Sequence, residues 1–131
     1  MQILNQFPPN IEAIRKRFEL DGFPTAVFTY GDKLYNPVGL DIPPDLMAHE
    51  EVHEKQQAIL GVQQWWDLYL TDDTFRLSQE VEAYKEQYQH AKENYNRDLR
   101  RQVLSHIVHN LSSKLYGKII NKKLAKELIY G

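Results

Sequence analysis

Residues 74 to 111 contain neither glycine nor proline, and this uninterrupted stretch restricts the fold more than any other feature of the chain. Its apolar residues recur at helical spacing, and the candidate capping residues Thr71, Asp72 and Asp73 stand just ahead of it. We therefore expect a long third major helix here. Because such a length is unusual for one helix in a globular protein, a bend near Asn94 to Asn96 would be in keeping with it.

Turn and capping residues divide the rest of the chain into shorter elements. The runs TAVFTY (residues 25–30) and KLYNP (residues 33–37) are rich in β-branched or aromatic residues and flank the turn pair Gly31-Asp32, which predicts a β-hairpin. The other expected helices are residues 10–18, with Asn10 as N-cap, Pro44–Leu60, ended by Gly61, residues 62–70, and a short basic helix after Gly117. The predicted fold class is α+β, mainly helical, with the hairpin before the helix Pro44–Leu60.

Length and composition indicate one globular domain. A chain of 131 residues can bury a single core, and we find no linker, repeat or low-complexity segment, so residues 1–131 are expected to form one domain. The formal net charge of −2 argues against a dedicated nucleic-acid binder. Lysines gather near the C-terminal end, where we interpret them as a solvated helix face: Lys114, Lys118, Lys122, Lys123 and Lys126.

The absence of cysteine limits the kinds of metal site that this chain can build. No disulfide and no thiolate ligand can form, so a transition metal would have to be held by imidazole and carboxylate groups, which suit zinc. No apolar run is long enough for a signal peptide or a membrane span. We therefore expect no membrane partner and a cytoplasmic location.

The stretch LMAHEEVHEKQQ, residues 46–57, contains the pattern H-E-x-x-H. On a helix, His49 and His53 lie four residues apart on one face and can direct two imidazoles at one metal ion, with Glu50 beside them as a general base. The alternative is an amphipathic helix whose charged face happens to contain histidines. Two ligands do not hold a zinc ion, so the metal hypothesis requires a third.

The long helix offers two carboxylates as the third ligand, Glu80 and Glu82. Helical periodicity places Glu80 at the edge of the apolar stripe and Glu82 on a solvated face. A carboxylate on a buried stripe is costly unless it is paired or bound to a cation, so we predict Glu80 as the ligand. The alternative is a buried ion pair, for instance with Arg76 one turn earlier.

The residues His49-Glu50-x-x-His53 followed on a later helix by Glu80-x-x-Ala83 resemble the gluzincin branch of the zinc metallopeptidases. This resemblance implies a zincin-like domain in which His49, His53 and Glu80 bind Zn²⁺. Tyr84 stands where members of that branch often carry an aspartate. The resemblance also implies that TAVFTY is an edge strand that pairs with a peptide substrate in extended conformation. The chain is similar, too, to small H-E-x-x-H proteins of tailed bacteriophages, which would place it in a host cytoplasm or a virion.

If the protein is such an enzyme, a metal-activated water attacks the peptide bond and Glu50 accepts its proton. The sequence leaves open which group stabilises the oxyanion; the candidates are Tyr69, Tyr84, Tyr116, His106 and His109. Gln56 and Gln57 could orient a ligand through hydrogen bonds. Two other functions remain open: a catalytically silent zinc-binding structural or assembly protein, and a helical interaction module without metal.

Overall fold

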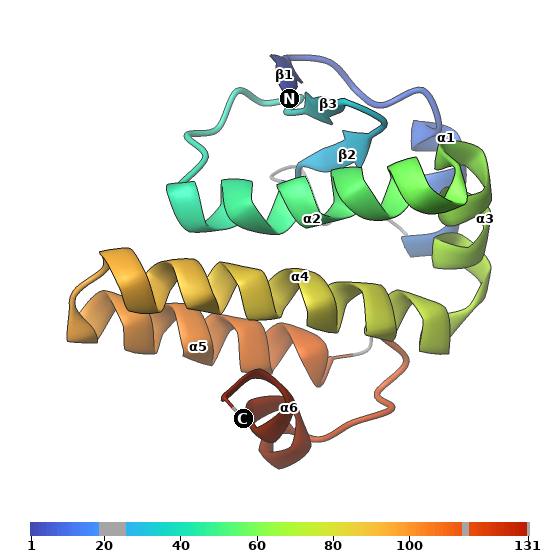
Figure 1. Cartoon of the computed structure of the whole chain (residues 1–131). Coiled ribbons are helices and arrows are strands. Elements are labelled where there is room, and N and C mark those ends of the chain that lie inside the picture. Colours follow the sequence, from blue (N-terminus) through green and yellow to red (C-terminus); the bar gives the residue numbers. More distant parts are fainter. Residues whose placement is uncertain (19–25, 114–115, 131) are drawn as a thin grey trace.

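Two antiparallel helices form the centre of the molecule: α2 (Pro44–Leu60) and α4 (Asp73–Asn94). The computed structural model describes residues 1–18, 26–113 and 116–130. Figure 1 shows a small sheet on one side of α2 and α4 on its other side, with α5 (Arg97–Leu111) beyond α4. The described part of the chain is therefore mainly helical, as the sequence predicts.

The bounds of α2 are those expected from local signals. Pro43 is the N-cap and Pro44 the first residue of the helix, where a missing backbone N–H costs no hydrogen bond. Gly61 ends the helix with a φ of 101°, a conformation that residues with a side chain rarely adopt. The shorter helix α3 (Val62–Thr71) follows directly, so the turn at Gly61 sends the chain across the ends of α2 and α4 (Figure 1).

The long glycine-free stretch is two helices rather than one bent helix. Asp72 caps α4 by accepting a hydrogen bond from Phe75 N, as expected, but the helix ends at Asn94. Tyr95 is extended, with φ −108° and ψ 156°, and the Asn96 side chain then caps α5 by accepting from Leu99 N. The interruption lies where a bend was expected, yet the chain reverses there, so that α5 packs back along α4 (Figure 1).

The predicted hairpin is present, and it belongs to a sheet of three strands in the described residues: β1 (Gln2–Leu4), β2 (Phe28–Tyr30) and β3 (Lys33–Tyr35). Strands β2 and β3 are antiparallel around Gly31, as expected, whereas β1, which the sequence does not reveal, pairs parallel to β3. The strand order β1-β3-β2 leaves β2 at an edge. Thr25, the first residue of the predicted strand, lies outside the described residues.

Gln57 joins the hairpin to α2. Its amide oxygen accepts from Gly31 N at 2.7 Å, and its amide nitrogen donates to the Thr29 carbonyl at 2.9 Å. Trp66 donates a second hydrogen bond to the same carbonyl. These hydrogen bonds fix the position of β2 relative to α2, the helix that carries Glu50.

Apolar side chains form two clusters on either side of the histidine pair. The larger joins α4, α5 and α6 (Lys122–Tyr130) and contains Leu77, Tyr84, Tyr88, Ile107, Leu111, Tyr116, Ile120, Ala125 and Ile129. The smaller joins α3 to α1 (Ile11–Phe18) around Ile14, Trp65 and Trp66. Polar side chains that are buried between the two clusters must find hydrogen-bond partners within the protein.

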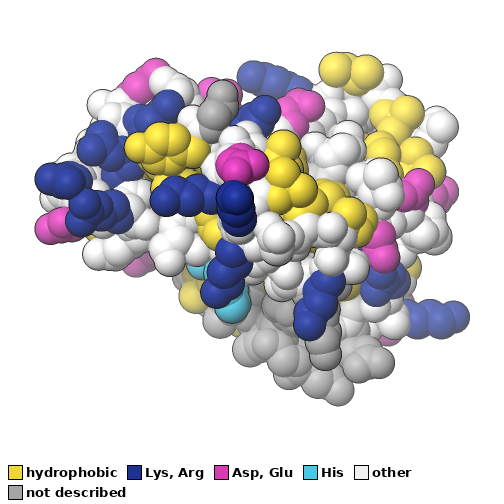
Figure 2. Space-filling view, turned by 90° about the horizontal axis from the view of Figure 1, so that it is seen from below, with side chains coloured by type: hydrophobic (Ala, Val, Ile, Leu, Met, Phe, Trp, Pro, Cys, Tyr) yellow, Lys and Arg dark blue, Asp and Glu magenta, His cyan; other side chains and the backbone are white. Residues whose placement is uncertain are grey.

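The C-terminal lysines lie on a solvated face, as predicted, for the four that the structure describes. Lys118, Lys122, Lys123 and Lys126 are exposed, and Lys114 lies outside the described residues. Figure 2, which looks onto the side of the molecule where α6 lies, shows Lys and Arg side chains gathered there. Among the described helices, none combines the length and the apolar character that crossing a lipid bilayer requires.

Candidate metal centre

Helix α2 presents both histidines on the side that faces α4. His49 and His53 are only 4% and 5% exposed, and their ring centroids lie 4.8 Å apart. The i, i+4 spacing brings their Nε2 atoms within 3.1 Å of each other. The sequence prediction that these two imidazoles share a face is therefore confirmed.

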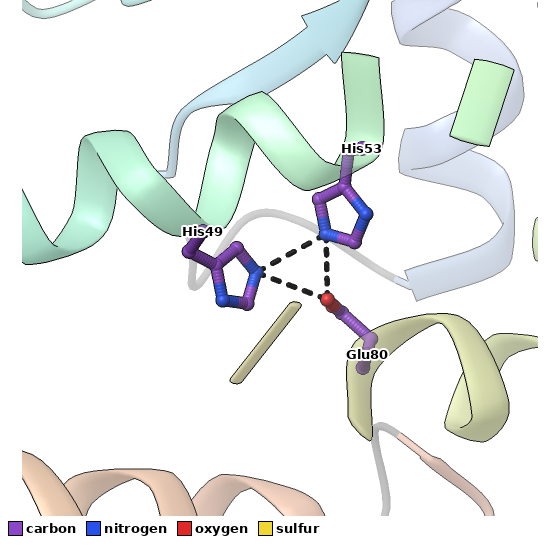
Figure 3. A group of neighbouring side chains, drawn as sticks. All are labelled: His49, His53 and Glu80. Atoms are coloured by element: carbon purple, nitrogen blue, oxygen red, sulfur yellow. Dashed lines mark hydrogen bonds and ion pairs between the residues drawn. The ribbon is translucent and has the colours of Figure 1, made fainter. Parts of the chain in front are cut away.

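Glu80 reaches the same point from α4 (Figure 3). Its Oε1 lies 3.0 Å from His49 Nε2 and 2.7 Å from His53 Nε2, and the residue is 5% exposed. The three residues form a buried group that can hold a metal ion. Glu82 is exposed, which agrees with the periodicity argument that distinguished the two carboxylates.

Gln56 determines which nitrogen of His53 carries the proton. The Gln56 amide nitrogen donates to the Gln79 carbonyl at 3.0 Å, so the amide oxygen is the atom that faces His53 Nδ1, at 2.9 Å. An oxygen there can only accept, and Nδ1 must therefore donate. In neutral His53 this leaves the lone pair of Nε2 directed at the Glu80 carboxylate.

That arrangement requires a cation. The short contact between His53 Nε2 and Glu80 Oε1 would otherwise join two atoms that both carry lone pairs. A proton can supply the charge: burial lowers the pKa of His53, but the Glu80 carboxylate more than offsets it and raises that pKa to about 9. Burial opposes the charge on Glu80 as well, yet the two histidines hold its pKa well below its usual range. A divalent metal ion satisfies the same three atoms.

The size of the group suits a small metal ion. Ligand atoms of a tetrahedral zinc, at bonds of about 2.0–2.1 Å, lie roughly 3.3 Å apart. The three contacts here are 3.0, 2.7 and 3.1 Å, so the group would open only slightly around an ion. Two nitrogens and one carboxylate oxygen are also the donor set of many catalytic zinc sites, which leave one position for water.

Two tyrosines hold the other oxygen of Glu80. The hydroxyls of Tyr69 and Tyr116 each donate to Oε2 at 2.8 Å. Burial and the adjacent Glu80 charge raise the pKa of both phenols well above the ordinary value, so both remain protonated donors. With Oε2 engaged twice, Glu80 offers Oε1 alone to an ion. These two tyrosines were candidates for the oxyanion role, but their hydroxyls are committed to Glu80.

Glu50 lies beside the group and is held by the sheet. It is 7% exposed, and its Oε2 accepts a hydrogen bond of 2.7 Å from the hydroxyl of Thr29 in β2. Glu50 and the three predicted ligands line one pocket of about 390 Å³. Ala26 and Val27, just before β2, line it as well. The second residue of the H-E-x-x-H pattern thus gives the pocket a carboxylate that does not belong to the group of three predicted ligands.

The remaining predicted residues have different surroundings. Arg76, the alternative partner of Glu80, forms an ion pair with Asp73 and donates to the Tyr69 carbonyl. His106 and Tyr84 line the pocket, and the Tyr84 ring packs at 4.4 Å against His49. His109 is exposed and lines a separate surface hollow between α5 and α6.

The sequence did not reveal the contacts of Thr29 and Tyr116 with this site. Both residues come from elements far from α2 in the sequence, and each contacts a predicted site residue through one hydroxyl. No local pattern of residues signals such a contact. In contrast, Gln56 and Gln57 were candidates because they stand on the final turn of α2. Gln56 forms the predicted hydrogen bond to His53, whereas Gln57 binds Gly31 and Thr29 of the hairpin.

Replacing Gln56 tests how far its hydrogen bond stabilises the metal-binding form of His53. Gln56→Leu keeps the volume but removes the acceptor for Nδ1, so we expect zinc to bind about 10- to 100-fold more weakly. Competition with a fluorescent zinc chelator measures this affinity. Gln64→Leu changes an exposed glutamine on the neighbouring helix and serves as the control. Equal affinity of both variants for zinc would contradict the role assigned to Gln56.

Comparison of the chain with protein-family models, with curated proteins and with solved structures gives no match, so the inference of function depends on the geometry of the site.

Proposed function

We propose that this protein is a zinc-dependent metallopeptidase with a zincin-like fold of the gluzincin type. The observation that supports the proposal most directly is the convergence of two histidine nitrogens and one carboxylate oxygen on a buried point, with His53 fixed in the form whose Nε2 is free. Glu50, the second residue of the H-E-x-x-H pattern, lines the same pocket. This combination of a ligand group with an adjacent carboxylate is what hydrolysis requires.

In the proposed reaction, zinc bound at this site would supply Lewis acidity toward the carbonyl and toward a water. Glu50 accepts the proton of the attacking water and passes it to the leaving amine. The Thr29 hydroxyl orients the Glu50 carboxylate through Oε2 and leaves Oε1 to act on the proton. Tyr69 and Tyr116 are bound to Glu80, so Tyr84 and His106 are the remaining oxyanion candidates that line the pocket. Asn110 contacts both of them, and the Tyr84 hydroxyl also interacts with that of Tyr116.

The proposed substrate is a peptide in extended conformation. Strand β2 is at the edge of the sheet, but the Thr29 carbonyl already accepts from Gln57 and Trp66. Pairing with a substrate strand would therefore use the backbone just before β2, where Ala26 and Val27 line the pocket. In this proposal the peptide lies beside Glu50 rather than over Gly31.

A catalytically silent zinc-binding structural or assembly protein is the second candidate. The specific observation in its favour is the burial of the ligand group, since His49, His53 and Glu80 are each no more than 5% exposed. A metal site so enclosed stabilises a fold whether or not a substrate can enter. The distinction between the two functions depends on turnover, not on metal binding.

Zinc analysis of the purified protein, followed by incubation with a peptide library, tests the proposal. We expect about one equivalent of zinc per chain, a higher melting temperature with zinc than after treatment with a chelator, and cleavage products detectable by mass spectrometry. Less than about a tenth of an equivalent, without stabilisation on adding zinc, would contradict both metal hypotheses and favour an interaction module. Full zinc occupancy without any cleavage would favour the structural protein.

A further inference from the structure

A second buried carboxylate lies one helical turn before His49 on α2. Asp45 is 6% exposed; its Oδ1 accepts from the Tyr95 hydroxyl at 2.7 Å and its Oδ2 accepts from the Gln87 amide at 2.8 Å. Within residues 1–18, 26–113 and 116–130, no lysine, arginine or histidine forms an ion pair with it. Asp45 lies in the first turn of α2, and its two partners there are a neutral hydroxyl and a neutral amide.

Gln87 carries an acceptor that lacks a donor. The Gln87 amide nitrogen donates to Asp45, since an amide oxygen in that position would face the carboxylate without a proton between them. The amide oxygen Oε1 therefore points away from Asp45. Gln87 is 4% exposed, and its Oε1 is buried without a hydrogen-bond partner in the described part of the chain. A buried acceptor in this state is rare in folded proteins, and it indicates a partner that binds from outside.

These two residues face a hollow that adjoins the candidate metal centre. The hollow has a volume of about 450 Å³, and apolar side chains of Pro43, Leu99 and Val103 form much of its wall. Gln87 and His106 line both this hollow and the pocket of the metal group. The two cavities are therefore adjacent, and a ligand that passes Gln87 and His106 would occupy both of them.

The spacing fits an extended peptide. Gln87 is two helical turns beyond Glu80 on α4, which corresponds to about 10 Å along the helix. An extended chain covers this distance in about three residues. A side chain that enters the hollow would thus belong to a residue two or three positions from the bond at the metal centre.

We propose that the hollow is a subsite for a lysine side chain of the bound peptide, an inference that rests on the proposed peptidase function. The aliphatic stem packs against Leu99 and Val103, and the ammonium group donates to Gln87 Oε1 and to the Asp45 carboxylate. An ammonium suits the site better than a guanidinium. The two oxygens of Asp45 are already engaged by different donors, which leaves no free edge for a bidentate pair.

Peptide binding to the zinc-loaded Glu50→Gln protein tests this subsite without cleavage of the probe. The probes are fluorescent alanine-based hexapeptides with one lysine or one norleucine at each position in turn. We expect the lysine peptide to bind at least about tenfold more tightly than its norleucine counterpart at one position. Gln87→Leu and Asp45→Asn should each abolish this preference, whereas Gln89→Leu, an exposed change on the same helix, should retain it.

Equal affinity of lysine and norleucine peptides at every position would overturn the subsite. Its failure is distinguishable from a failure of the proposed function. Cleavage of alanine peptides by the wild-type protein without any lysine preference would leave the peptidase in place and remove the subsite. A lysine preference in binding without any cleavage would support the subsite and contradict the peptidase. Asp45→Asn keeps the shape of the side chain, so it tests the charge even if Gln87→Leu folds poorly.

Discussion

Glu50→Gln is expected to reduce peptide hydrolysis by a factor on the order of 10² to 10⁴ while zinc remains bound at the wild-type stoichiometry. The amide has the shape of the carboxylate and can still accept the hydrogen bond of the Thr29 hydroxyl, so the fold and the pocket should persist. It cannot accept a proton, which removes the step that we assign to Glu50. Hydrolysis of a quenched fluorescent peptide and elemental analysis of zinc provide the two measurements.

Glu51→Gln is the matched control for this change, because Glu51 is exposed on the same helix. It removes the same charge from the sequence and should leave the rate of hydrolysis unchanged. A Glu50→Gln protein that cleaves at the wild-type rate would show that another group accepts the proton. Equal losses in both variants would indicate an effect of helix charge rather than of a general base.

The second large effect is expected at the third ligand. Glu80→Ala should weaken zinc binding by more than about 100-fold, because the ion would lose one of three protein ligands. Loss of a group that only supports a ligand has a smaller effect, about 10- to 100-fold. Glu82→Ala should leave the affinity unchanged, since Glu82 is exposed on the same helix. Competition titration with a zinc chelator compares the two variants directly.

Glu80→Ala also leaves the hydroxyls of Tyr69 and Tyr116 without their acceptor, so a loss of fold could imitate a loss of affinity. Glu80→Gln separates these effects. The amide oxygen can still accept from the tyrosines, but the side chain loses its charge and should bind zinc far more weakly than the wild type. Equal zinc affinities of Glu80→Ala and Glu82→Ala, with both proteins folded, would refute the assignment of Glu80.

The sequence predicted the bounds of the helices that carry the site accurately where proline or glycine marks them. Helix α2 begins at Pro44 and ends before Gly61, as expected, because proline and glycine act on the backbone of their own residues. Between α4 and α5 no such breaker exists, and the prediction of one bent helix was wrong. Tyr95 adopts an extended conformation and Asn96 starts a new helix, an arrangement that the packing of α5 against α4 stabilises.

Strand β1 shows the same limit in the sheet. Gln2, Ile3 and Leu4 are too few to show any periodicity, and their pairing with β3 is a contact between distant parts of the chain. The hairpin was predictable because its two strands are joined by a glycine turn.

By itself, the sequence determined that His49 and His53 share one face of a helix, that Glu50 stands beside them, and that Glu80 rather than Glu82 faces the interior. These properties follow from helical periodicity and from the cost of burying a carboxylate. Only the tertiary structure decided that the three groups meet within hydrogen-bonding distance, that Gln56 selects the tautomer of His53, and that Tyr69 and Tyr116 leave Glu80 a single free oxygen. The physical reason is that these contacts depend on how α2, α3 and α4 pack, and packing is set by the whole core rather than by neighbours in the sequence.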